Sequence, residues 1–159
     1  MKKALFLDRD GVVNREHGFT FEPSRFEILP DLVEALCLAR DKGYKLIIVS
    51  NQSGIAKGLY TAAHVEILHE ILVKEVGTAG VKFDEIYYCV HHPDVTRCIC
   101  RKPDSLFVEK ALARFDLDPA ACYFIGDKER DVQAAEKAGV KGVLIPANTS
   151  ILGIVKLFP

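Results

Sequence analysis

The sequence lacks both a large excess of charge and a long apolar run. Its 159 residues carry a formal net charge of -1 at pH 7, and the pI is about 6.5. Without a basic surface field, we expect no binding to nucleic acid or to an anionic membrane surface. The apolar stretch near the start, in MKKALFLDRDG, is too short for a signal peptide core or a membrane span. We therefore expect a cytosolic monomer whose partner is a small molecule.

Internal repeats and low-complexity segments are absent too, and the length suits one domain over residues 1–159. Instead, apolar runs typical of strands alternate with stretches of helical period. Strands are expected near 5–8, 44–50, 83–89, 121–126 and 142–145, and helices near 32–42, 62–76, 105–115 and 129–138. Asp31 and Thr61 are expected to cap the first two helices, and Asp104 or Ser105 to start the third. This alternation predicts an α/β fold, a three-layer doubly wound parallel sheet with right-handed crossovers; the segment 148–159 stays unassigned.

Two carboxylates, Asp8 and Asp10, lie at the C-terminal tip of the first expected strand in LFLDRDG. Alternate residues of an extended chain share a face, so both acids are expected to occupy the same small space. Their like charges repel unless a divalent cation or a shared proton lies between them. An N-capping Asp beside a solvated turn is the simpler interpretation of this short pattern.

Polar clusters also follow the second and fourth strands, and the carboxyl ends of parallel strands meet at one edge of a sheet. Ser50 ends the second strand and Asn51 follows it, and Asp127 and Lys128 follow the fourth. With no Gly-rich dinucleotide turn and no Ser-His pair, these groups suit phosphoryl chemistry, which needs a cation and hydrogen-bond donors around the transferring group. Asp8 and Asp127 could hold Mg²⁺ through carboxylate oxygens, with Lys102 neutralising further charge.

Four motifs, DRDG, VSNQSG, RKP and GDKERD, resemble in this order the signature motifs of haloacid dehalogenase-like phosphatases. The resemblance covers nearly the whole chain. It implies that Asp8 is the nucleophile, which forms an aspartyl-phosphate, and that Asp10 is the general acid and base. It further implies that Ser50 and Lys102 hold the phosphoryl oxygens. Asp8, Asp127 and the backbone carbonyl of Asp10 would bind Mg²⁺, with Asp131 supporting the site, and the short spacing between motifs leaves no room for a cap domain.

Five cysteines, an odd number, include three within twelve residues, which fits reduced or metal-bound thiols better than a disulfide framework. Cys89, His91, Cys98 and Cys100 supply the ligand set of a tetrahedral structural zinc site. His91 is preferred over His92 by the Cys-x-His spacing. Reduced core cysteines beside a satisfied histidine are the alternative. Zinc here would hold in place the loop that presents Arg101 and Lys102, without a part in the chemistry.

The zinc loop narrows the resemblance to the subgroup that contains D-glycero-D-manno-heptose 1,7-bisphosphate 7-phosphatase and histidinol-phosphatase. The segments HGF, NQSGIAKG, YYCVHHP and CRKP look more like the heptose enzyme. In contrast, the stretch of six residues between His91 and Cys98 is shorter than is usual in the heptose enzymes and is typical of the histidinol enzymes. The resemblance implies contacts with a sugar bisphosphate from Glu16, His17, Gly18, Phe19, Ser50, Asn51, Gln52, Ser53, Arg101, Lys102 and Lys128. In this set, Arg101 could clasp the second phosphate as a bidentate fork. A zinc-stabilised module that binds a phosphorylated ligand without turnover is a third possibility.

Overall fold

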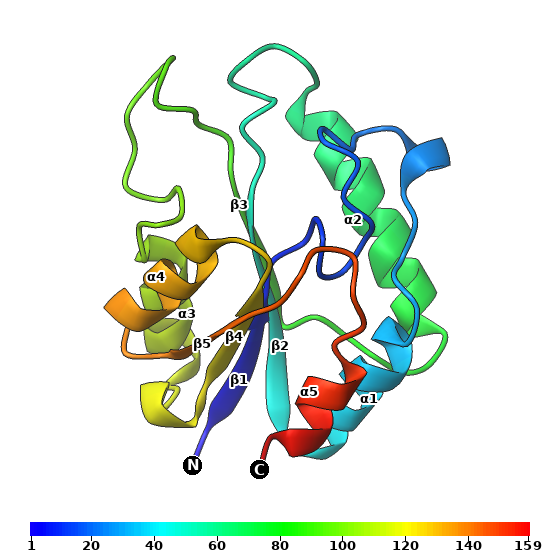
Figure 1. Ribbon diagram of the computed structural model, residues 1–159, viewed down its shortest axis with the longest axis vertical. Helices are drawn as coiled ribbons and strands as arrows, with labels where there is room; N and C mark the ends of the chain where they lie inside the picture. Colours follow the sequence, from blue (N-terminus) through cyan, green and yellow to red (C-terminus); the bar gives the residue numbers. More distant parts are fainter.

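The chain folds around one parallel five-stranded β-sheet (Figure 1). The computed structural model describes all residues, 1–159. The strands are β1 (Lys3–Leu7), β2 (Tyr44–Asn51), β3 (Glu85–Cys89), β4 (Tyr123–Gly126) and β5 (Lys141–Leu144), in the order β3-β2-β1-β4-β5. The chain thus starts in the middle strand, builds the sheet to one edge and then returns to build the other. In such a sheet, ligands bind at the carboxyl end of the strand where the order reverses, which here is β1.

Helices cover both faces of the sheet and complete the three layers expected from the sequence. They are α1 (Leu32–Asp41), α2 (Ala62–Gly77), α3 (Leu106–Phe115), α4 (Glu129–Lys137) and α5 (Leu152–Leu157), with 3₁₀ turns at Pro23–Arg25 and Pro119–Ala121. In Figure 1, α1, α2 and α5 lie on one side of the sheet, and α3 and α4 lie on the other. None of the helices is both long and apolar enough to cross a membrane.

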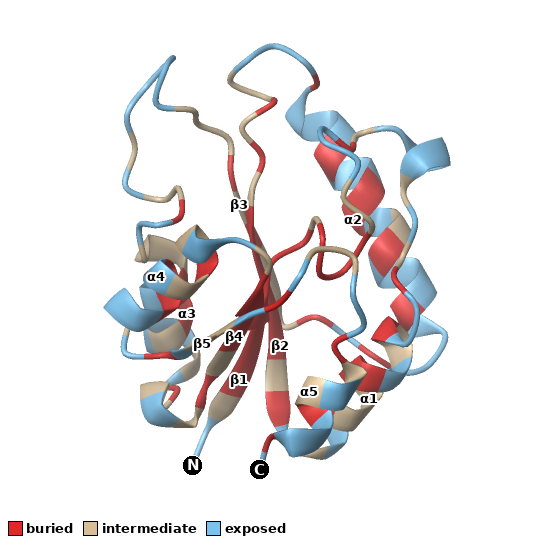
Figure 2. Cartoon of the chain, viewed as in Figure 1, coloured by how far each residue is buried: buried red, intermediate tan, exposed pale blue.

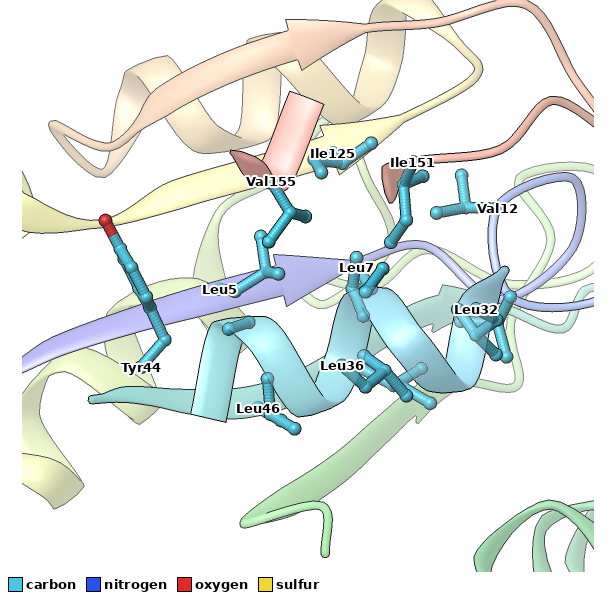
Figure 3. Packing of buried hydrophobic residues seen from close by; sticks show 14 of the residues in the cluster. Leu5, Leu7, Val12, Leu32, Leu36, Tyr44, Leu46, Ile125, Ile151 and Val155 are labelled. Atoms are coloured by element: carbon cyan, nitrogen blue, oxygen red, sulfur yellow. The ribbon is translucent and has the colours of Figure 1, made fainter. Parts of the chain in front are cut away.

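Side chains of β1 alternate between two separate hydrophobic clusters. Leu5 and Leu7 pack with Leu36 of α1 and Val155 of α5 (Figure 3). The intervening Phe6 belongs to the second cluster, which includes residues of α3 and α4. Both faces of the central strands are therefore covered, which explains why these strands are apolar without alternation. Figure 2 shows the result, since burial runs along the central strands and one side of α2.

The first helix begins where the sequence places it, but the prediction that Asp31 caps it was wrong. Asp31 has a φ of 63°, in the left-handed region, and its carboxylate accepts no hydrogen bond from the first turn. Only its main-chain carbonyl takes part, accepting a hydrogen bond from the Ala35 N–H. Packing of Leu32 and Leu36 into the core holds the helix instead.

Two strands start two residues later than expected. β3 begins at Glu85 because the Asp84 carboxylate accepts a hydrogen bond from the Leu46 N–H at 2.9 Å, in place of a main-chain partner. The expected start of β4 is taken up by the 3₁₀ turn at 119–121. Both differences lie at the amino ends of the strands, away from the edge that carries the polar clusters.

The segment 148–159, which the sequence left unassigned, docks as a helix. Val155 of α5 is fully buried against α1, and Phe158 stacks on Tyr123 with 4.0 Å between ring centroids. Tyr44 completes this contact by donating its hydroxyl hydrogen to a main-chain oxygen of Pro159 at 3.1 Å. The end of the chain therefore covers the apolar groove beside α1 and β4.

Candidate active site

A buried lysine lies between two carboxylates at the carboxyl end of β1. Lys102 donates to Asp8 Oδ1 at 2.8 Å and lies 2.8 Å from Asp131 Oδ1. It also donates to the carbonyl of Val49 at 2.6 Å, and it is 1% exposed. Burial alone would lower the pKa of Lys102, but the negative charges of Asp8 and Asp131 raise it. The amine is therefore a fixed positive charge directly beside Asp8.

Asp127 brings a third carboxylate to the same place. Both of its oxygens are buried and accept no hydrogen bond, although Lys128 Nζ approaches one of them at 3.1 Å. One oxygen from each of Asp8, Asp127 and Asp131 lies within 4.8 Å of the others. Burial raises the pKa of Asp8 to about 8, although Lys102 opposes the rise. Clustered carboxylate oxygens with too few donors are the ligand set that a hard cation such as Mg²⁺ prefers.

Two glycines allow these acids to converge. Gly11 follows the Asp8–Asp10 pair with a φ of 88°, and a Cβ atom there would lie 2.6 Å from Asp127 Oδ2. Gly126 ends β4, and its added Cβ would lie 2.2 Å from Asp131 Cβ. Real Cβ atoms do not approach so closely, so the carboxylates of Asp127 and Asp131 take the space that side chains at these positions would fill.

Asp10 is held from both sides by hydrogen bonds. Its Oδ1 accepts from Arg9 Nη2 at 2.8 Å and from Asn14 Nδ2 at 3.0 Å, and its Oδ2 accepts from Gln52 Nε2 at 2.9 Å. Arg9 is fully buried, so its charge is balanced mainly by Asp10. The carboxyl of Asp10 thus has a fixed orientation. Neither Arg9 nor Asn14 stands out in the sequence, because only their contacts reveal their role.

Gln52 links Asp10 to the end of β2. Its Nε2 also donates to Ser50 Oγ at 2.7 Å, and its Oε1 accepts from the Tyr60 hydroxyl at 2.7 Å. Burial raises the pKa of Tyr60 to about 12, so the hydroxyl remains a donor at neutral pH. An added Cβ at Gly54 would lie 2.1 Å from the Tyr60 ring, which explains the glycine there. Gln52 is therefore an orienting group for both Ser50 and Asp10.

Asn51 pairs with the main chain of Lys102 in both directions. Its Oδ1 accepts from the Lys102 N–H at 3.0 Å, and its Nδ2 donates to the Lys102 carbonyl at 3.1 Å. This reciprocal pair fastens the loop that carries Lys102 to the end of β2. Asn51 was expected among the substrate contacts, and the structure gives its amide this positioning contact as well.

A pocket opens at Asp8 and Asp10. Its lining consists of Asp8, Asp10, Glu16, Gly18, Phe19, Thr20, Asn51, Gln52, Ser53, Tyr60 and Arg130. The expected contacts Ser50, Lys102, Lys128, Arg101 and His17 are not part of this lining. Ser50 and Lys102 are buried beside it, His17 is exposed, Arg101 lines a neighbouring hollow, and Lys128 pairs with Asp127. Thr20, Tyr60 and Arg130 line the pocket without having been expected.

Cys89, the last residue of β3, comes together with His91, Cys98 and Cys100 of the loop that follows it. Cys89 Sγ lies 3.6 Å from Cys98 Sγ, 3.1 Å from Cys100 Sγ and 3.5 Å from His91 Nδ1. Donors bound tetrahedrally to zinc at about 2.0–2.3 Å lie roughly 3.5–3.8 Å apart, close to this spacing. His92 lies outside the group and interacts with Asp94 instead. The cluster fits the ligand set expected from the sequence, with His91 as the preferred histidine.

Comparisons with known proteins agree with this geometry. Residues 2–139 match the model of the haloacid dehalogenase-like hydrolase family. The D-glycero-beta-D-manno-heptose-1,7-bisphosphate 7-phosphatase of Haemophilus ducreyi is 41% identical over 146 residues, which are 88% of this chain and 80% of that protein. The Escherichia coli K12 protein of the same name is 40% identical over 143 residues, which are 86% of this chain and 75% of that protein.

A solved structure shares nearly the whole fold. The D,D-heptose 1,7-bisphosphate phosphatase of B. bronchiseptica, complexed with magnesium and phosphate, has a TM-score of 0.87 and 30% identity, and covers 98% of this chain and 97% of that one. The corresponding enzyme of Burkholderia thailandensis has a TM-score of 0.63 and 28% identity, and covers 87% of this chain and 75% of that one. The family expected from the four motifs is thereby confirmed. This chain belongs to the haloacid dehalogenase-like hydrolases and is a phosphatase of that family.

Proposed function

We propose that the protein removes the 7-phosphate of D-glycero-D-manno-heptose 1,7-bisphosphate through an aspartyl-phosphate on Asp8. The convergence of Asp8, Asp127 and Asp131 around Lys102, with carboxylate oxygens within 4.8 Å of one another, carries this proposal. Relatives about 40% identical have this activity in their names, which favours the heptose substrate over histidinol phosphate. A binding module without turnover is set aside, since the family is one of hydrolases, the relatives are named phosphatases, and both Asp8 and Asp10 are present.

Asp8 acts as the nucleophile in the proposed reaction. A carboxylate oxygen of Asp8 forms a bond to phosphorus while the bond from phosphorus to the sugar oxygen breaks, and Asp10 gives its proton to that leaving oxygen. Water then attacks phosphorus, Asp10 takes the proton from the water, and the bond to Asp8 breaks. Lys102 and Ser50 stabilise the phosphoryl oxygens, and Arg9 and Gln52 hold the carboxyl of Asp10 for both proton transfers.

Mg²⁺ would be held by the carboxylates of Asp8 and Asp127 and by the carbonyl of Asp10. The buried oxygens of Asp127, which accept no hydrogen bond, support this assignment. When bound, the ion supplies positive charge that offsets the negative charge of the phosphoryl group. Asp131 takes no direct part in the proposed chemistry, and it positions Lys102 through their 2.8 Å ion pair.

A second ion, Zn²⁺, is proposed at Cys89, His91, Cys98 and Cys100. The sulfurs of Cys98 and Cys100 lie 3.6 and 3.1 Å from Cys89 Sγ, so their thiolates would need a cation to offset their charge. Burial raises the pKa of both the Cys89 and Cys100 thiols. The proposed role is structural, since the four donors fill a tetrahedral coordination shell. The ion would fix the loop that leads directly into Arg101 and Lys102.

Release of inorganic phosphate tests the proposed function. We expect the protein with Mg²⁺ to hydrolyse the heptose bisphosphate, to hydrolyse histidinol phosphate at least tenfold more slowly, and to lose activity on chelation of Mg²⁺. Asp8→Asn should lower kcat by about three orders of magnitude or more, because it removes the nucleophile. Asp116→Asn, which alters an exposed carboxylate paired with Lys2, is the matched control and should keep full activity. A faster rate on histidinol phosphate would contradict the assigned substrate.

A further inference from the structure

The turn between β5 and α5 lies beside the loop that follows β1 (Figure 1). This turn, residues 146–149, runs between Ile145 and Ile151, which are both buried in the hydrophobic cluster beneath α1. Within it, the Thr149 hydroxyl donates to the carbonyl of Pro146 at 2.7 Å. The turn is therefore anchored in the core at both of its ends.

Asn148, in this turn, makes two separate contacts with the loop after β1. Its main-chain N–H donates to the carbonyl of Gly11 at 2.8 Å. Its side-chain Oδ1 accepts from the main-chain N–H of Glu16 at 2.6 Å, and its Nδ2 lies 3.5 Å from the Glu16 carbonyl oxygen. The φ of Asn148 is 64°, in the left-handed region that Asn adopts more readily than most residues. The main chain of Asn148 thus holds the turn after Asp10, and its side chain holds Glu16.

Glu16 begins the part of the loop that lines the active-site pocket. The lining includes Glu16, Gly18, Phe19 and Thr20, in a segment that contains no helix or strand. The far end of this segment is held where Arg9 Nη2 donates to the Thr20 carbonyl at 3.1 Å. The hydrogen bond from the Glu16 N–H to the turn after β5 fixes the near end.

We propose that Asn148 is a positioning residue for substrate binding, whose side chain holds the segment 16–20 against the sugar of the bound phosphoester. The inference rests on the proposed function for the identity of this substrate. Asn148 does not line the pocket, so it has no part in bond breaking. Loss of its side chain should weaken substrate binding, whereas the hydrogen bond to Gly11 comes from the main chain and is retained.

Steady-state kinetics of Asn148→Gly separate binding from chemistry. Glycine adopts the left-handed backbone and keeps the hydrogen bond to Gly11, so only the side chain is lost. We expect the KM for the heptose 1,7-bisphosphate to rise about three- to tenfold, because one partly buried hydrogen bond is removed, with kcat within about twofold. The Ki of inorganic phosphate, which has no sugar to contact the segment, should stay within about twofold as well. Asp31→Gly, which changes an exposed residue with a φ of 63°, is the matched control and should alter none of these constants.

Amide hydrogen exchange, measured by NMR, tests the same contact without turnover. We expect the Glu16 amide hydrogen to exchange at least about tenfold faster in Asn148→Gly, because its acceptor is removed. Asn148→Asp keeps an acceptor oxygen and tolerates the left-handed backbone, so it should keep this exchange within about twofold of the unmodified protein.

Two kinds of result would overturn the inference. One is an unchanged KM or an unchanged exchange rate in Asn148→Gly, which would show that the side chain does not position the segment. The other is a Ki for phosphate that rises as much as KM, or a kcat that falls as much as KM rises, which would indicate a general disturbance of the site. Failure of the proposed function is a separate result, because the unmodified protein then releases no phosphate from the heptose bisphosphate. Histidinol phosphate would replace it in the KM measurement, and the exchange experiment would stand as it is.

Discussion

At the scale of single residues, the surroundings of Asp8 disfavour the ionised form of its carboxyl group. Its pKa is raised from 3.8 to about 8, by burial first and also by the charge of Asp131, and the ion pair with Lys102 offsets only part of this. Between these two pH values the folded chain binds more protons than the unfolded chain. The free energy of unfolding contributed by Asp8 therefore falls as the pH rises from about 4 to about 8 in the absence of metal.

Asp8→Asn should remove this dependence on pH. Asn resembles the protonated acid, so we expect the Tm of the metal-free variant to match that of the unmodified protein near pH 5. Near pH 8.5 it should exceed it by roughly 3 °C or more. Mg²⁺ should narrow the difference by stabilising the unmodified protein preferentially. Thermal unfolding at both pH values, with Asp116→Asn as the control, checks this, and a difference in Tm that does not change with pH would contradict it.

The place of a residue in the site was predictable where a sequence motif contains it. It was not predictable where only contacts in the folded chain bring the residue there. Asp8 and Asp127 could be placed together because each directly follows a strand, at the carboxyl edge of the sheet. Lys102 could be added because it lies in a loop at the same edge. Arg130 could not, because nothing in the sequence distinguishes it from a solvated residue of a helix. The same holds for Arg9, whose importance lies in its burial against Asp10.

Among the elements, the loop between β3 and α3 depends most on something other than packing. It has no helix or strand of its own from residue 90 to 105, and its cysteines and His91 are its main internal contacts. At its end, Asn51 holds the main chain of Lys102. The position of the site lysine is thus set from β2 on one side and by the cysteine cluster on the other.

Removal of one cluster ligand should therefore release this loop. We expect Cys98→Ser to lower the zinc content from one ion per chain to less than about 0.2, and to lower both Tm and kcat, because metal binding contributes to folding. Cys37→Ser, outside the cluster and half-buried on α1, is the matched control and should retain the ion. Elemental analysis and thermal unfolding measure the two effects. A full zinc content in Cys98→Ser would contradict the ligand assignment.

The order of the elements was readable from the sequence, and their exact ends were less so. Periodic apolar positions predicted the five strands and the helices α1 to α4, because both faces of the sheet are covered by amphipathic helices. The prediction that the Asp31 side chain caps α1 was wrong, because packing of Leu32 and Leu36 holds the start of the helix without a capping hydrogen bond. The docking of α5 was not predictable, since the groove that it fills forms only when α1 and β4 are in place.

At the scale of the whole molecule, the strand order brings the residues of the site together. β1 lies between β2 and β4 in the sheet, so residues far apart in sequence meet at one edge: Asp8, Ser50 and Asp127 follow or end these three strands. The loops after β1, β2 and β3 rise above this edge in Figure 1 and surround it without an inserted domain. A site open to a small sugar phosphate follows from this arrangement.

A crystal structure with Mg²⁺ and beryllium fluoride, which mimics a phosphoryl group on a carboxylate, tests whether Asp8 and Asp127 bind the same Mg²⁺ ion. We expect beryllium bonded to an Asp8 oxygen, Lys102 and Ser50 beside its fluorides, and one Mg²⁺ bound by both Asp8 and Asp127. Beryllium on another residue, or a metal ion that contacts Asp127 without Asp8, would contradict the proposed aspartyl-phosphate mechanism.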